Sequence, residues 1–226
     1  MTEGLEFGAA AGFIDPALRA EFPGLRLEWL SIEARRRDSP RALKRRLMEL
    51  SSRYRGASVI AMRTQPIPHA YRAFYRQIGL DPDVTRIPSE EAAVARLLHG
   101  QFRPANLIDD ALLLALIETG VPVWAVDAEF VDAGGLGIRI TIDGDRLGST
   151  EVATYLPPGR LAVADARTAH ALLFDEVAPG HEVTSRTRRV VLFSVGVDGV
   201  PDIHLDEAMW VCVEALGSGL QDGPTG

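Results

Sequence analysis

The chain has 226 residues, of which 46% are hydrophobic and 24% charged, and its formal net charge is −7. This length and composition suit a globular protein with a proper core, and no run of about 18 apolar residues is present that could span a membrane. The first residues lack the basic segment of a secretory signal, and the single cysteine, Cys212, excludes an internal disulfide and a cysteine-based zinc cage, so we expect a cytoplasmic protein.

The pattern near the N-terminus predicts one strand and one helix. Residues 1–12 are rich in small side chains and are expected to form a flexible N-terminus, whereas Leu25–Ile32 is predicted to be a strand. Ser39 and Pro40 have the pattern of a helix N-cap followed by proline in the first turn. The residues expected on the apolar face of this helix are Leu43, Leu47, Leu50 and Tyr54.

Positive charge is concentrated in the first hundred residues. Residues 1–100 carry a net charge of +4, and residues 101–226 carry −11. Phosphate binding depends on Lys and Arg side chains, so any RNA contact is expected to use the basic cluster around the first predicted helix. The candidate RNA-binding residues are Arg35, Arg36, Arg37, Arg41, Lys44, Arg45 and Arg46. The alternative is an ordinary solvated helix surface.

Three further helices are predicted before residue 121. Gln65–Pro68 has the composition of a linker, and a helix is predicted over His69–Ile78. Ser89 is the expected N-cap of a short helix that ends at Gly100. Asn106 is the expected N-cap of a helix that continues to a glycine at position 120. Because this last helix is apolar on almost all sides, we expect it at the centre of the fold.

From residue 121 onward the pattern favours strands. The predicted strands are Val123–Val126, Gly137–Ile142, Arg160–Ala164, His170–Phe174 and Arg189–Val195. A closing helix is predicted over Ile203–Leu216, and residues 217–226 are expected to be a flexible tail. We therefore predict a single compact α+β domain over residues 13–216. Its N-terminal part is expected to be helical and its C-terminal part to hold a mixed or antiparallel sheet, with a possible subdomain seam near residue 65.

Motifs for nucleotide binding, serine hydrolysis and metal binding are absent from the sequence. There is no phosphate-binding glycine loop and no strained serine turn, and the glycine-rich stretch 131–137 is interpreted as a loop. The five histidines have no metal-ligand spacing, so no metal and no cofactor is expected. His181 lies in a polar loop and is the one histidine expected to reach a pocket, and Cys212 is expected to be a buried small hydrophobic residue.

Several segments, in order, resemble one protein family. They are Pro104–Asp109, Gly120–Asp127, Gly137–Ile140, Leu161–Asp165, Val183–Thr187 and Val190–Phe193, with Tyr71–Leu80 and Thr85–Arg86 upstream. Together they resemble the B3/B4 editing module of the phenylalanyl-tRNA synthetase β subunit, here standing alone. The resemblance covers about residues 13 to 216 and implies an α+β fold. In the synthetase this module hydrolyses tyrosine that has been wrongly esterified to the phenylalanine tRNA.

The resemblance also implies a set of pocket residues. The candidates are Asn106, Asp109, Trp124, Asp127, Arg139, His181, Thr184, Thr187 and Phe193. Trp124 stands where the family has a pocket histidine, and Phe193 where it has a glutamate that recognises the substrate. These two positions cannot hydrogen-bond a phenol, so a more apolar pocket is expected. Ordinary roles remain open for the polar candidates as helix caps, strand ends, surface ion pairs or turn residues.

Two functions from different classes follow. The first is a trans-acting hydrolase that binds tRNA and removes a mischarged aminoacyl group. The second is a binding module without catalysis, which holds a free amino acid or small ligand or serves as an adaptor for a partner protein. The net charge and the two apolar replacements favour the second, and the basic cluster favours the first. We favour an RNA-linked role with no membrane partner. The sequence pattern does not indicate the oligomeric state.

Overall fold

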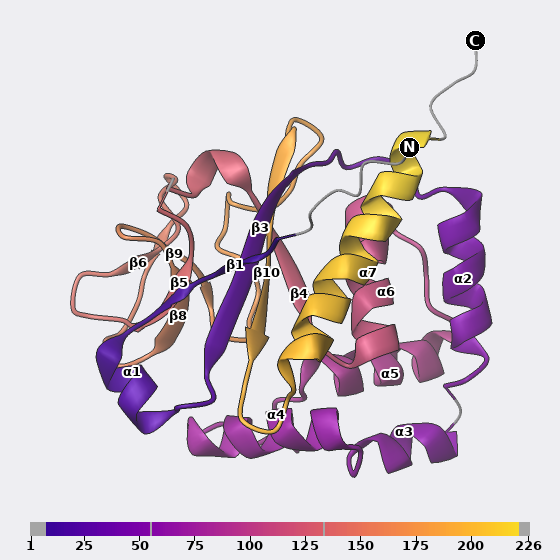
Figure 1. The fold of residues 1–226 in the computed structure, drawn as a ribbon, viewed down its shortest axis with the longest axis horizontal. Coiled ribbons are helices and arrows are strands. Elements are labelled where there is room, and N and C mark those ends of the chain that lie inside the picture. Colours follow the sequence, from indigo (N-terminus) through magenta and orange to yellow (C-terminus); the bar gives the residue numbers. More distant parts are fainter. Residues whose placement is uncertain (1–7, 55, 133, 222–226) are drawn as a thin grey trace.

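The computed structural model describes residues 8–54, 56–132 and 134–221, which form an α+β fold with two sheets (Figure 1). The helices are α1 (Pro16–Glu21), α2 (Arg41–Ser51), α3 (Gly56–Met62), α4 (Pro66–Gln77), α5 (Pro88–His99), α6 (Leu107–Thr119), the 3-10 turn η1 (Ala128–Phe130) and α7 (Asp202–Gln221). The α+β class predicted from the sequence is thereby confirmed.

The first sheet has four antiparallel strands. In spatial order they are β1 (Ala10–Ala11), β3 (Arg26–Glu33), β10 (Arg189–Gly196) and β4 (Val123–Asp127). Strand β10 pairs with β3 along its whole length and has a buried side chain at every position after Arg189. A strand that is buried on both faces needs a near-continuous apolar sequence, and β10 has one.

The second sheet has six short strands and is mixed. In spatial order they are β2 (Phe13–Ile14), β5 (Gly137–Ile140), β8 (Leu161–Ala164), β9 (Ala169–Leu172), β6 (Arg146–Leu147) and β7 (Thr154–Tyr155). Figure 1 shows this sheet on one side of β3 and β10, with α6 and α7 on the other. The two faces of β10 are thus covered by different layers.

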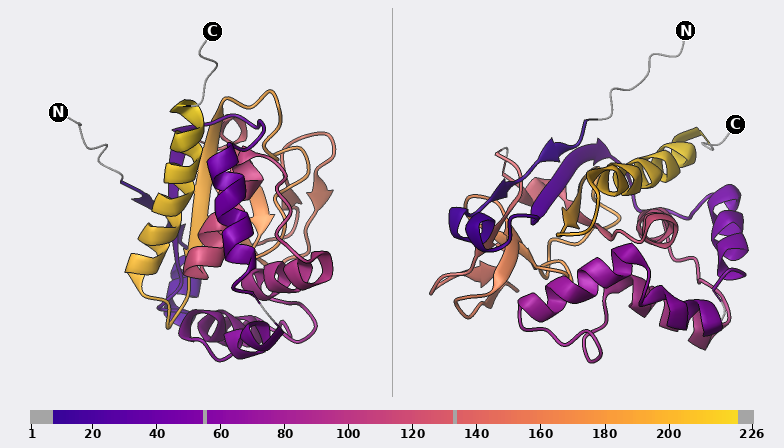
Figure 2. Two further views of the ribbon diagram at one scale, coloured as in Figure 1. Left: turned by 90° about the vertical axis from the view of Figure 1, so that its right-hand side faces the viewer. Right: turned by 60° about the horizontal axis from the view of Figure 1, so that its bottom comes forward.

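Helices α6 and α7 make the largest helix pair of the fold. The side chain of Asn106 accepts hydrogen bonds from the backbone N–H groups of Ile108 and Asp109, and Gly120 ends α6 with a left-handed φ of 77°, so both predicted boundaries of α6 are confirmed. Cys212 of α7 is fully buried in the same core, as expected. In the left view of Figure 2, where the right-hand side of Figure 1 faces the viewer, the two helices lie on the near side of the four-stranded sheet.

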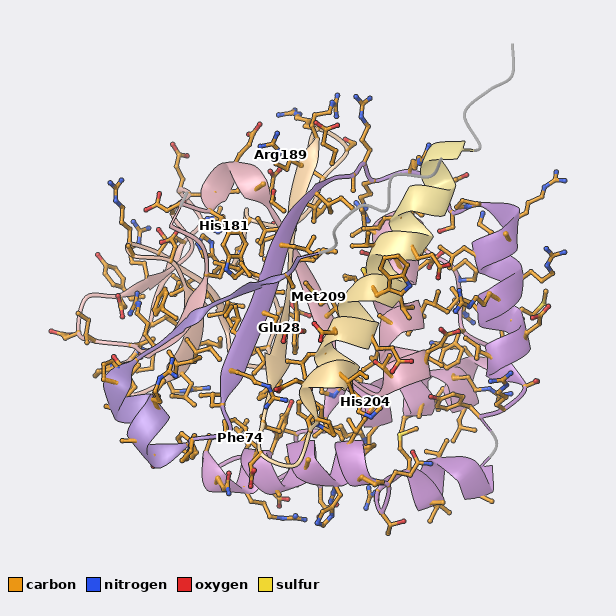
Figure 3. All side chains as sticks on the ribbon, viewed as in Figure 1. Glu28, Phe74, His181, Arg189, His204 and Met209 are labelled. Carbon is orange, nitrogen blue, oxygen red and sulfur yellow. The ribbon has the colours of Figure 1, made fainter. Side chains whose placement is uncertain are left out.

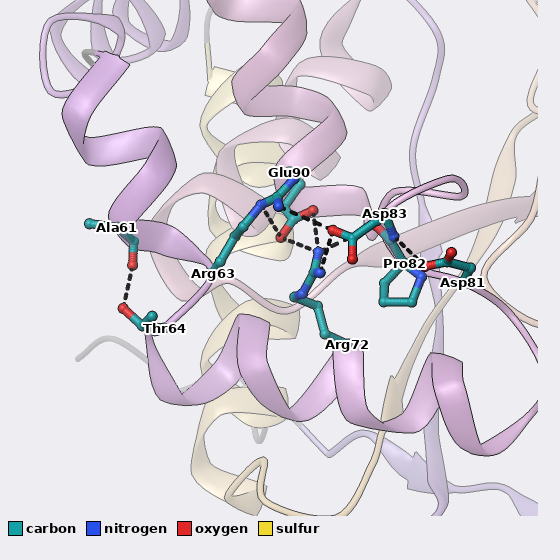
Figure 4. Close-up of polar contacts among 8 residues, drawn as sticks. All are labelled: Ala61, Arg63, Thr64, Arg72, Asp81, Pro82, Asp83 and Glu90. Carbon is teal, nitrogen blue, oxygen red and sulfur yellow. Dashed lines mark hydrogen bonds and ion pairs between the residues drawn. The ribbon is translucent and has the colours of Figure 1, made fainter.

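A buried ion-pair network joins α4, α5 and the loop between them (Figure 4). Arg72 and Glu90 are 5% and 3% exposed, and their closest N–O distance is 2.9 Å. Arg72 also binds Asp83 at 2.7 Å, and Arg63 reaches the same carboxylate at 3.1 Å. Because removing one partner of a buried pair leaves an uncompensated charge, this network fixes α4 against α5.

Several local predictions were wrong. The predicted linker Gln65–Pro68 contains the start of α4, because proline is accepted in the first turn of a helix, where no N–H donor is needed. Neither Ser39 nor Ser89 is an N-cap: Pro40 and Ile87 occupy those positions, and the Ser39 hydroxyl donates to Asp110 instead.

The expected boundaries of the termini also differ. Ala10 and Ala11 of the expected flexible N-terminus pair with β3, and residues 1–7 lie outside the described part. Helix α7 runs beyond Leu216 to Gln221, so the first residues of the expected tail are helical. The strand predicted over Leu25–Ile32 is confirmed as β3, so the N-terminal part supplies a long strand of the first sheet as well as helices.

Candidate functional site

A cleft of about 340 Å³ lies between the start of α6, strand β4 and the loop before β10. We call it the Trp124 cleft. It is lined by Arg36, Ile108, Asp109, Leu112, Trp124, Ala125, Val177, Glu182 and Val183. Most of these side chains are apolar, and the three charged ones are two carboxylates and one guanidinium. An apolar hollow with a few charged groups is the usual composition of a small-ligand site.

Aromatic side chains underlie one wall of the cleft. The rings of Trp124 and Phe193 are stacked, with centroids 5.6 Å apart and an interplanar angle of 10°, because the two residues face each other across β4 and β10. Phe193 is only 1% exposed. The two residues therefore lie against each other, but only Trp124 lines the cleft, whereas Phe193, the other pocket candidate, packs behind the Trp124 ring.

Each of the two carboxylates at the cleft, Asp109 and Glu182, accepts one hydrogen bond on one of its oxygens. Asp109 Oδ2 accepts from the side-chain amide of Asn106 at 2.5 Å, and Glu182 Oε2 accepts from the backbone N–H of Gly180 at 2.7 Å. Asn106 is 7% exposed and caps α6. The structure therefore gives it the role of a helix cap, and it is not among the residues that line the cleft. Asp109, an exposed residue, lines the cleft.

Asp127, Thr187 and Thr184 form a hydrogen-bonded cluster beside the cleft. The Thr187 hydroxyl donates to Asp127 and accepts from the backbone N–H of Thr184 at 3.0 Å. Asp127 and Thr187 are 6% and 1% exposed. These contacts join the end of β4 to the loop before β10, so the cluster holds the loop and does not line the cleft.

His181 is fully buried and belongs to a polar chain of four residues. Its Nε2 accepts from the backbone N–H of Ser149 at 3.0 Å, and its Nδ1 lies 2.9 Å from His170 Nδ1. His170 Nε2 lies 2.9 Å from Asp165 Oδ2. Since a backbone N–H can only donate, His181 carries its proton on Nδ1, and His170 must then donate from Nε2 to Asp165.

Two members of this chain, His181 and Asp165, have shifted pKa values. Burial, followed by the charge of His170, lowers the pKa of His181 to about 4. Burial raises the pKa of Asp165, but the N–H groups of Arg167, Asp132 and Thr168 and the His170 ring outweigh it, and the net pKa is lowered. His181 therefore stays neutral and anchors the loop that carries Glu182 and Val183 to the cleft (Figure 3).

Arg139 has a structural partner away from the cleft. It lies on β5 in the second sheet and makes a bidentate contact with Asp145, at 2.5 Å and 3.1 Å. This hydrogen bonding lowers the pKa of Asp145 against the opposing effect of burial. The ion-pair interpretation of Arg139 thus accounts for its contacts.

The basic residues divide into two groups. Arg35, Arg36 and Arg37 are exposed and follow β3, whereas Arg41, Lys44 and Arg45 are exposed on α2 and line a separate groove of about 280 Å³. Arg46 pairs with Glu118 through two hydrogen bonds of 2.8 Å and 2.5 Å. Arg46 is therefore engaged in holding α2 against α6.

Two arginines of the loop before β10 and the first residue of β10 join the first basic group. Arg186, Arg188 and Arg189 are exposed, Arg189 faces Glu33 across the strand pair, and the carbonyl of Arg188 accepts from the N–H of Ala34 at 3.2 Å. We call Arg35, Arg36, Arg37, Arg186, Arg188 and Arg189 the arginine rim. The sequence analysis missed its second half, because the two runs lie about 150 residues apart and meet only through the pairing of β3 with β10.

Elsewhere in the described part, a hollow of about 400 Å³ lies between α4, α6 and the start of α7. Within residues 8–54, 56–132 and 134–221, no three His, Cys, Asp or Glu side chains are grouped as metal ligands. No helix in those residues combines the length and apolar character needed to cross a bilayer.

Comparison with known proteins shows a distant similarity to a tRNA ligase subunit. The chain is 31% identical over 106 residues to the phenylalanine–tRNA ligase β subunit of Gloeobacter violaceus. The matched stretch is 46% of this chain and 14% of that subunit. No family model matches the chain. The distant similarity is to a tRNA ligase subunit, which agrees with the resemblance seen in the sequence.

Proposed function

We propose that the chain hydrolyses a mischarged aminoacyl-tRNA in trans, through a region like the B3/B4 editing module of the phenylalanyl-tRNA synthetase β subunit. The observation that carries the proposal is that Arg36 belongs both to the Trp124 cleft and to the arginine rim. An apolar hollow for an amino-acid side chain is thus adjacent to cations that suit phosphates. The similarity to a tRNA ligase β subunit supports an RNA-linked substrate, and we expect the protein to work in the cytoplasm.

The charged groups of the cleft suit the two polar ends of an aminoacyl ester. Asp109 and Glu182 supply acceptors for the α-ammonium group. The first four N–H groups of α6 already donate to Arg37, to the Asn106 side chain and to the Asn106 carbonyl. The helix end therefore has no N–H left for an oxyanion, and we assign stabilisation of the ester oxygen to the Arg36 guanidinium.

In the reaction, water adds to the ester carbonyl and the bond to the tRNA 3′ oxygen breaks. The products are a free amino acid and a tRNA with a free terminal hydroxyl. The side chain of the amino acid would rest on Trp124, between Leu112 and Val183. Because most side chains that line the cleft are apolar, and Phe193 stands where the resemblance implies a glutamate that would accept from a phenol, the cleft favours an apolar aminoacyl group over a phenolic one.

A deacylation screen tests the proposal. tRNAs charged with a panel of amino acids are incubated with the protein, and release of the amino acid is measured. We expect release for one or a few apolar amino acids. Arg36→Gln and Trp124→Ala should each reduce it at least tenfold, whereas Arg160→Gln, an exposed arginine far from the cleft, should keep the wild-type rate. Absence of release from every charged tRNA would overturn the enzymatic proposal.

A second candidate is a binding module that holds a free amino acid without catalysis. It is favoured by the lack of any described serine, threonine, cysteine or histidine among the residues that line the cleft, so no hydroxyl, thiol or imidazole of the chain is there to attack the ester. Calorimetric titration with free amino acids separates the two. Binding of an apolar amino acid that Trp124→Ala abolishes, together with no deacylation, supports the binding module. If the binding module is instead an adaptor, we expect it to bind a partner protein and to show neither deacylation nor amino-acid binding.

A further inference from the structure

The arginine rim gathers six exposed arginines where β3 ends and β10 begins. Figure 3 shows Arg189 at the start of β10, among other side chains that end in nitrogen. The two groups of three arginines are held together by backbone contacts. Arg189 lies opposite Glu33 in the ladder between β10 and β3, and the N–H of Ala34 donates to the carbonyl of Arg188. Since β10 and β3 pair along eight residues, the position of the rim is set by a rigid part of the fold.

Five of the six guanidinium groups of the rim are available for a partner, and the sixth, that of Arg188, is hydrogen-bonded to its own loop. Among the described residues, no ion pair engages any of the six, and all six are exposed. The side chain of Arg188 donates from Nη1 to carbonyls of Ser185, Arg186 and Thr187, at 3.1, 2.9 and 3.3 Å. This arginine therefore braces the loop that presents the others.

Two hollows lie on either side of the Arg35–Arg37 segment. One is the Trp124 cleft, which Arg36 enters. The other has a volume of about 430 Å³ and is lined by Glu33, Ala34, Arg35, Arg37, Leu107, Arg188 and Leu216. Arg35, Arg37 and Arg188 thus meet in a groove that adjoins the cleft. The acidic groups nearby are Glu33 in the groove, Asp38 after the segment, and Asp109 and Glu182 in the cleft.

We propose that the arginine rim is the RNA-binding surface of this protein, and that it guides the 3′ end of a tRNA along the 430 Å³ groove into the Trp124 cleft. The inference rests on the proposed function and assigns the surface by which that function reaches its substrate. Arginine forks bind phosphate oxygens in a bidentate manner. A cationic groove that leads to an apolar cleft suits a strand whose last residue bears an amino acid.

The rim is a better phosphate surface than α2. Arg46 of α2 is already paired with Glu118 and lies 3.9 Å from Glu214. The other three α2 cations lie along a groove that contains Met48 and Phe102 and does not adjoin the Trp124 cleft. An RNA bound there would have its terminal residue outside the cleft. The two surfaces therefore make different predictions for binding.

The test is titration of labelled, uncharged tRNA at two salt concentrations with three matched variants. The first removes three rim charges, Arg35→Ala/Arg37→Ala/Arg189→Ala. The second removes the three α2 charges, Arg41→Ala/Lys44→Ala/Arg45→Ala. The third removes three exposed arginines from other elements, Arg19→Ala/Arg86→Ala/Arg160→Ala. All three change the net charge equally, so general electrostatics are held constant. Thermal unfolding of each variant verifies the fold.

We expect the rim variant to bind tRNA at least tenfold more weakly and with a shallower dependence on salt, because about two or three phosphate contacts are lost. The third variant should bind within threefold of wild type. A larger loss in the α2 variant than in the rim variant would overturn the inference and leave the proposed function standing. Wild-type protein that binds no tRNA even at low salt would overturn both, and would favour the binding module.

Discussion

The buried pair Arg72–Glu90 makes a quantitative prediction about stability. Arg72 binds two carboxylates: Glu90, whose side chain is 4% exposed, and Asp83, whose side chain is 52% exposed. Breaking a buried pair from one side costs about 3 to 5 kcal/mol, whereas an exposed pair contributes about 0 to 1 kcal/mol. Glu90→Gln should therefore lower the free energy of unfolding by about 3 kcal/mol, and Asp83→Asn by less than about 1 kcal/mol.

The two variants are matched, since each replaces a carboxylate by an amide opposite the same arginine. The assay is urea unfolding at neutral pH followed by tryptophan fluorescence, with thermal unfolding as a second readout. For a chain of this size, a loss of 3 kcal/mol corresponds to a fall in Tm of about 6 to 12 °C. Equal losses in the two variants would refute the assignment of burial as the cause.

Three further outcomes are expected. Burial, then Asp206, raises the pKa of Glu28 from 4.5 to about 6, so the folded state holds this proton more tightly than the unfolded state and stability should fall as pH rises from 4.5 through 6. Glu28→Gln should remove that dependence and stabilise the protein near pH 8 by about 1 kcal/mol, after allowance for the half-buried position. Thr187→Val leaves the buried Asp127 carboxylate without its donor and should cost about 1 to 3 kcal/mol, whereas Thr187→Ser should restore most of it; both are measured by urea unfolding. Burial raises the pKa of the Cys212 thiol to about 12, so a thiol reagent should modify Cys212 only in denaturant, and rapid labelling of the native protein would contradict the fold.

Helix boundaries that depend on residues within one turn could be predicted from the sequence. Asn106 and the glycine after residue 119 bound α6 because capping depends on residues within one turn. The same local signal was present for α1, where the Asp15 side chain caps a helix that begins at Pro16, and it was overlooked. Strands β6 and β7 have two residues each, which is too short for an alternating pattern to be recognised.

The candidate site was only partly predictable, because its residues converge through long-range pairing. The resemblance named Trp124 and Phe193 as pocket candidates but not which of them is buried, since burial depends on the layers on both sides of β10. His181 was expected in a pocket and lies instead in the core, bonded to His170 of a neighbouring strand. No local pattern reports that two histidines eleven positions apart share a hydrogen bond across a loop.

The position of β10 between β3 and β4 has a consequence for how the chain folds. More than 150 residues separate β3 from the strand that pairs with it, and contacts of such sequence separation slow folding, because a large loop must close first. During synthesis, β3 and β4 emerge with unpaired edges long before β10 is available. Exposed strand edges pair readily with other chains, so the newly made polypeptide is expected to need protection from aggregation until residue 196 has left the ribosome.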